Sequence, residues 1–145
     1  MHKGQLTYED AKSLLENWDA DHIRMDWCVQ RLNELRRLAD AAPSISYEPH
    51  GTGGKRRELK DKVNELADFE LKYKEQLADL EKRADKITYI LNLLSRVHPR
   101  YASLITMRYL QHKTLGEIAE KLGISSSYIF AELKKAITEF GQCWN

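Results

Sequence analysis

The sequence predicts an all-α fold, in which a long antiparallel two-helix coiled-coil hairpin is followed by a C-terminal domain of three shorter helices. Glycine and proline are scarce, at 7 and 3 of 145 residues, and 31% of the residues are charged, which is a helical composition. Apolar residues recur every three and four positions over long stretches. Capping residues and a glycine then divide the last part of the chain into short helical segments.

The first long helix is expected to begin at Thr7. Asp10 follows Thr7 by three residues, as in a capping box with Asp in place of Glu, and acidic side chains suit the positive end of a helix dipole. Apolar positions then alternate by three and four, with Asp21 the one polar member, at 11, 14, 18, 21, 25, 28, 32, 35, 39 and 42. The series predicts one continuous helix.

A loop over 43–56 should end this helix, because two prolines and three glycines fall between 43 and 54. The series resumes, with Glu70 the one polar member, at 59, 63, 66, 70, 73, 77, 80, 84, 87, 91 and 94. A repeat averaging 3.5 residues is typical of a coiled coil. Residues 1–97 are therefore predicted to form a helical hairpin.

Two questions about this hairpin stay open from the sequence. The same apolar seams are compatible with pairing between two chains, which would make a homodimer through the long helices. The polar seam positions Asp21 and Glu70 either fix the register, pair with a neighbouring Lys or Arg, or face water.

The loop carries a glycine-rich and basic segment that ends in Lys55, Arg56 and Arg57. It is not a P-loop, because Pro49 stands where the first glycine belongs and Arg56 where a Ser or Thr belongs. Two alternatives remain: a flexible basic tip whose three cations contact DNA phosphates, or a solvated turn that leads into the second helix.

Residues 98–145 predict a separate domain of three helices. Pro99 suits the first position of a helix that runs to about residue 110. Thr114 and Glu117 make a complete capping box for a helix over 115–122, and Gly123 suits its C-terminal cap. Ser125 then caps a last helix from Ser126 to about residue 140, which should stop at Gly141. Two short helices joined by a tight glycine turn predict a helix-turn-helix.

This motif resembles region 4 of bacterial sigma factors. The resemblance is carried by Thr114, Leu115, Glu117, Ile118, Ala119, Leu122, Gly123, Ile124 and Ser125, followed by Ile129, Leu133 and Ala136. In organisation, with two long charged helices ahead of the motif, the chain is also similar to phage-encoded late transcription regulators of the ArpU/RinA type.

The resemblance implies double-stranded DNA as the partner. It places Ser126, Ser127, Phe130 and Ala131 toward the major groove, and Lys134, Lys135, Lys113 and Thr114 at the backbone; Ser125 and Tyr128 complete the implied set. The sequence departs from the family at Tyr128, where Arg often follows Ser-x-Ser, and no Arg or Gln reaches a groove-facing position. Specificity is therefore expected from dimer spacing, DNA shape or RNA polymerase rather than from bidentate base contacts.

Several classes of function have no support in the sequence. No nucleophile, carboxylate pair or metal-spaced cluster stands where an element would position it, so we expect no enzyme, cofactor or metal. Cys28 and Cys143 are far apart, which argues against a disulfide framework. No apolar stretch is long enough for a bilayer, and we expect a cytoplasmic protein without membrane contact.

Three functions fit these observations. The first is a DNA-binding transcription regulator, activator-like and of phage or prophage type, that binds promoter DNA and contacts RNA polymerase. The second is a DNA-packaging subunit like a phage small terminase, which would assemble as a ring of many copies. The third is a protein-binding module with a drifted helix-turn-helix. The net charge of only +1 does not imply strong unaided binding to nucleic acid.

Overall fold

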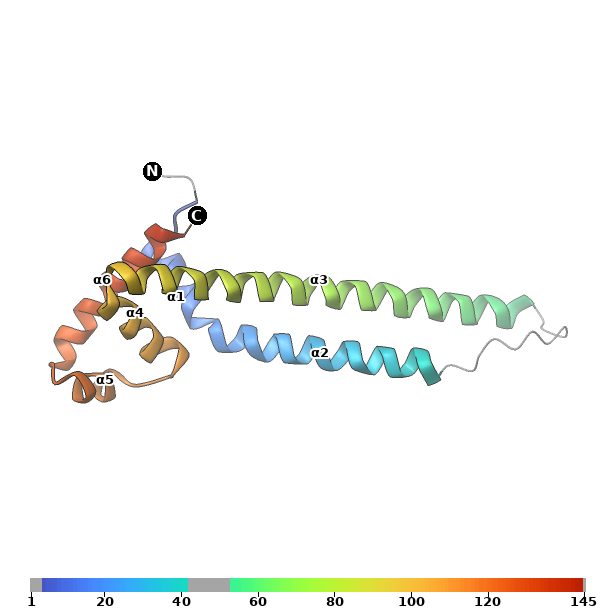
Figure 1. Cartoon of the computed structure of the whole chain (residues 1–145). Helices are drawn as coiled ribbons and strands as arrows, with labels where there is room; N and C mark the ends of the chain where they lie inside the picture. The colour runs from blue at the N-terminus through green and yellow to red at the C-terminus, as the bar shows by residue number, and fades with distance from the viewer. Residues whose placement is uncertain (1–3, 42–52, 145) are drawn as a thin grey trace. The chain divides into compact units, whose positions relative to one another are not determined.

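The computed structural model describes residues 4–41 and 53–144, with side chains described from residue 60 in the second stretch. All regular elements in these ranges are helical, as predicted (Figure 1). They are α1 (Tyr8–Glu16), α2 (Trp18–Ala41), α3 (Gly53–Val97), α4 (Pro99–Ile105), the π-helical η1 (Thr106–Leu110), α5 (Leu115–Leu122) and α6 (Ser126–Cys143).

The predicted loop lies mostly outside the described residues, since 42–52 are not among them. Its last part is helical, because α3 begins at Gly53 rather than after residue 56. Lys55, Arg56 and Arg57 therefore lie near the start of α3. Their side chains fall outside the described residues, so phosphate contact by these three cations stays a prediction.

Residues 22–82 form one compact unit, in which most of α2 and the first part of α3 run antiparallel (Figure 1). Trp27 and Tyr73 meet edge to face with ring centroids 5.3 Å apart, and the Cys28 thiol lies 3.7 Å from the Gln76 side-chain oxygen. The long helices thus pair within one chain. Among the described side chains of this unit, Cys28, Leu35 and Leu80 are buried, which makes a thin core.

The polar seam positions both lie beside cations. Asp21 accepts a hydrogen bond from Arg83 at 3.1 Å, and Glu70 pairs with Lys74, one helical turn away, at 2.9 Å. Both positions thus pair with a neighbouring cation, and Glu70 also faces water. An exposed pair such as Glu70 and Lys74 contributes little to stability.

The predicted first helix is interrupted at Asn17, so the expectation of one continuous helix is wrong there. Asn17 caps the end of α1, and α2 begins at Trp18. The reason lies in burial: α1 buries Ala11 and Leu15, which are spaced by four residues and are 0% and 1% exposed. Ala11 belongs to the heptad series and Leu15 does not, so the face that α1 buries is wider than the predicted seam.

Residues 1–21 and 83–145 form the second compact unit. Its core is drawn from the two ends of the chain and includes Ala11 and Leu15 of α1, Ile87 and Ile90 of α3, and buried residues of α4, η1, α5 and α6. This unit is larger than the predicted 98–145 domain. The sequence does not show that α1 and the last turns of α3 belong to this unit, because the heptad series runs through both.

At Gly141, α6 lies close to the segment preceding α1. The Leu6 amide donates to the Gly141 carbonyl at 2.9 Å, and a β-carbon on Gly141 would lie 2.7 Å from the Leu6 carbonyl oxygen. The prediction that α6 stops at Gly141 is wrong, since the helix continues to Cys143. The glycine is there to allow a close approach of two backbones.

Candidate nucleic-acid interface

Helix α5 begins with the predicted cap. The Thr114 hydroxyl accepts from the Glu117 amide at 3.1 Å and donates to the Glu117 carboxylate at 3.2 Å. In a full capping box the Glu117 carboxylate would accept from the Thr114 backbone amide. Here it accepts from the Thr114 hydroxyl instead. The helix ends as predicted at Gly123, whose φ of 68° is left-handed, and the Ile124 amide donates to the Ala119 carbonyl at 3.1 Å.

Helix α6 follows after this turn. Ser125 caps it, and its hydroxyl accepts from the Tyr128 amide at 3.3 Å. One face of α6 is buried at Ile129, Leu133, Ala136, Ile137 and Phe140. These residues belong to the core of the second compact unit.

The opposite face of α6 is exposed. Phe130 is 59% exposed and Tyr128 48%, so neither aromatic ring is committed to the core. The other residues predicted on this helix are exposed as well: Ser125, Ser126, Ser127, Ala131, Lys134 and Lys135. The structure brings these side chains to one accessible helix, while their contact with DNA remains a prediction.

The approach to α5 adds two backbone-contact candidates from the sequence, Thr114 and Lys113. Thr114 is exposed and Lys113 is half-buried. The neighbouring Lys121 side chain lowers the pKa of Lys113. Sequence reasoning did not select Lys121, because Lys113 lies before the Thr114 cap and outside α5, where helical spacing does not apply.

The segment before α5 is held in an unusual conformation. The end of the expected 99–110 helix is π-helical from Thr106 to Leu110, and His112 has a φ of 57°. The Arg108 guanidinium donates to the Lys113 carbonyl at 3.2 Å, and His112 pairs with Asp19. π-Helical turns and left-handed non-glycine residues are both associated with functional sites. Arg108 is a second residue that the sequence analysis did not select.

The charge of Tyr128 is controlled by its neighbour on α6. A hydrogen bond to the Glu132 carboxylate, together with its negative charge, raises the pKa of Tyr128. The phenol is therefore neutral at physiological pH. It occupies the position where the related pattern often has Arg, and it offers no positive charge to a guanine.

The geometry is that of a helix-turn-helix: two helices joined by a left-handed glycine, the second with one buried and one exposed face. Residues 87–139 match the family model described as Sigma-70, region 4. No curated protein and no solved structure matches the chain. The chain thus carries a sigma region 4-like helix-turn-helix, a module of DNA-binding type, and the match begins in α3, ahead of the predicted boundary at 98.

Two further observations concern the described parts of the chain, residues 4–41 and 53–144. No helix there combines the length and apolarity that a membrane span requires. No group of three or more His, Cys, Asp or Glu side chains is placed there to hold a metal ion.

Proposed function

We propose that this protein is a DNA-binding transcription regulator that reads promoter DNA through α6. The observation that carries the proposal is the division of α6 into a buried face that completes the core and an exposed face that begins at its capped N-terminus. A recognition helix needs both, since its N-terminal residues must reach base edges while the rest of the module holds it in place.

The roles of the exposed side chains follow from their size and charge. Small Ser126, Ser127 and Ala131 let the helix backbone approach the bases, and Phe130 contacts a thymine methyl group. Lys134 and Lys135 bind phosphates, and Lys113 and Thr114 do so at the start of α5. With no Arg or Gln on this face, selectivity comes from DNA shape and from the spacing of bound copies.

Salt-dependent binding tests this proposal. Genomic fragments that bind the protein are first recovered and made into labelled duplexes. Fluorescence anisotropy then gives the affinity for these duplexes at several salt concentrations. Replacing both Lys134 and Lys135 by Ala should weaken binding and reduce the slope of log K against log salt by about two, since each phosphate contact contributes roughly 0.9. Replacing Lys72 and Lys82, two exposed lysines of α3, is the matched control. Equal slopes for the two double variants would count against the proposal.

The finer role that we propose is activator-like and of phage or prophage type, with RNA polymerase as a direct partner and no catalytic step. It is supported by the sigma region 4 match together with the two long helices ahead of it. Retention of RNA polymerase by the immobilised protein, with and without promoter DNA, tests this role. Retention of the polymerase without any DNA binding would instead support a purely protein-binding module.

We also propose a homodimer through the hairpin unit. Its thin core leaves apolar side chains accessible, with Trp27 42%, Phe69 40% and Val63 52% exposed. A second copy would cover such side chains and give the DNA-binding helices two-fold symmetry. Light scattering measures the mass in solution: a dimer supports this assembly, a monomer contradicts it, and a large ring favours DNA packaging.

A further inference from the structure

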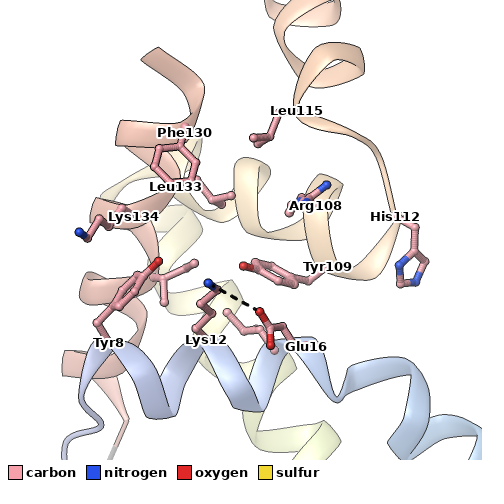
Figure 2. Close-up of a pocket in the computed structure, with 12 residues that line it drawn as sticks. Tyr8, Lys12, Glu16, Arg108, Tyr109, His112, Leu115, Phe130, Leu133 and Lys134 are labelled. Carbon is pink, nitrogen blue, oxygen red and sulfur yellow. Dashed lines mark ion pairs between the residues drawn. The ribbon is translucent and has the colours of Figure 1, made fainter. Parts of the chain in front are cut away.

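A hollow of about 430 Å³ lies beside the exposed face of α6. Its walls come from α1, from η1 and the segment after it, from the start of α5, and from α6 itself (Figure 2). Apolar side chains of Leu15, Leu133 and Ile137 contribute to its lining. All the residues that line it belong to the second compact unit. The α1 wall lies outside the segment that matches region 4.

Hydrogen-bond donors from two walls point into this hollow. Figure 2 shows the hydroxyl groups of Tyr8 and Tyr109 and the ammonium group of Lys12 directed toward its centre. Burial first, and then the nearby Glu16 carboxylate, raise the pKa of Tyr109, so this hydroxyl is protonated at neutral pH and able to donate. These are the groups that an anion with several oxygens requires.

The cations of the hollow outnumber its carboxylates. Lys12, Arg108 and Lys134 line it, against the single acidic side chain of Glu16. Lys12 lies 3.9 Å from Glu16, too far for a hydrogen bond, so this contact leaves the ammonium protons available. Lys134 lies over the Tyr8 ring, with its ammonium nitrogen 5.6 Å from the ring centroid.

We propose that this hollow binds a phosphate of the DNA backbone, so that α1 is part of the DNA-binding surface. The inference rests on the proposed function and extends it. Phe130 and Lys134 line the hollow and also belong to the exposed face of α6, so a duplex seated on that face passes over the hollow. Lys12 and Tyr8 are the contacting residues, and Arg108 is a positioning residue that holds the Lys113 carbonyl.

Two substitutions in the full chain test the inference, one that removes a positive charge from the hollow and one that removes a negative charge. Lys12→Gln should weaken duplex binding about 3- to 10-fold at low salt and reduce the salt slope by about 0.9. Tyr8→Phe keeps the ring beneath Lys134 and should weaken binding by a smaller factor. Glu16→Gln removes the one carboxylate of the hollow and should strengthen binding about 3-fold. Arg96→Gln, on an exposed position of α3, is the control.

The sign of the Glu16→Gln effect separates electrostatics from structure. If α1 merely supported the fold, Lys12→Gln and Glu16→Gln would shift DNA affinity in the same direction. Thermal unfolding followed by circular dichroism shows for each variant whether the fold is kept. Equal losses of affinity for these two variants overturn the inference.

Two further outcomes also overturn it and are distinguishable. If the α1 variants bind like the wild type while the Lys134 and Lys135 double variant loses affinity, α1 is not a contact and the proposed function stands. If the wild type binds no duplex at all, both fall. Titration with inorganic phosphate, monitored by the NMR signals of Tyr8 and Tyr109, tests whether the hollow binds free phosphate instead of a phosphate of DNA. Saturable binding that leaves DNA affinity unchanged identifies the hollow as a small-anion site instead.

Discussion

Replacing Gly141 by Ala tests how tightly α6 approaches the start of the chain. The added β-carbon would lie 2.7 Å from the Leu6 carbonyl oxygen and 3.3 Å from the Ala11 β-carbon, and neither atom can rotate away. Overpacking of this kind costs about 1–3 kcal/mol, and weakening the bond from the Leu6 amide adds up to about 1 kcal/mol. The better helix propensity of Ala offsets about 1 kcal/mol. The expected loss in unfolding free energy is therefore up to about 3 kcal/mol, after the gain in helix propensity is taken off.

Urea unfolding followed by circular dichroism measures this difference. Gly116→Ala is the matched control, because the nearest atom to its β-carbon is the Thr114 hydroxyl oxygen at 3.8 Å, an ordinary contact. That variant should be unchanged or more stable by up to about 1 kcal/mol. If Gly141→Ala gains as much stability as Gly116→Ala, the two backbones are not in close contact. The packing of the chain's start against α6 would then have to be revised.

Three more predictions concern the caps and the hollow. Thr114→Ala removes the acceptor of the Glu117 amide and should cost about 1 kcal/mol, whereas Thr114→Ser should cost little; equal values in urea unfolding would refute the cap. Gly123→Ala forces a side chain into a φ of 68° and should cost about 1 kcal/mol, and a neutral result would contradict the left-handed turn. Burial raises the pKa of Tyr109 above its ordinary 10.0, so its stabilising contribution is full below about pH 10 and is lost as the pH rises through the raised value. Tyr109→Phe should thus lose less stability between about pH 9 and 11 than the wild type, and parallel curves would disprove the shift.

The elements that the sequence predicts correctly are those set by local chemistry. Thr7, Thr114 and Ser125 each accept from an amide three residues ahead, and Gly123 has the left-handed backbone that its type suggests. Such bonds join residues close in the chain, so the residue types alone specify them. The buried stripe of α6 is predictable for the same reason, because its period is fixed by the helix.

The features that the sequence does not reveal depend on residues distant in the chain. The heptad series passes through Asn17 without interruption, so no local signal shows that α1 ends there or that Leu15 is buried. The hollow needs α1, η1 and α6 together. Gly141 was misread because a glycine near a helix end has two uses, a cap and a close approach, and only the position of Leu6 decides between them.

The second compact unit draws its core from helices that lie on both sides of the hairpin unit in the sequence. Ala11 and Leu15 are fully buried in its core, and burial of a leucine side chain alone contributes about 1.5–3 kcal/mol. The core is therefore incomplete without α1, although the region 4 match begins only at residue 87. α1 leads through Asn17 into α2, and the last turns of α3 supply Ile87 and Ile90. Pairing of the long helices thus keeps the two ends of the core at high effective concentration, so that the hairpin supports the fold of the module as well as any dimer.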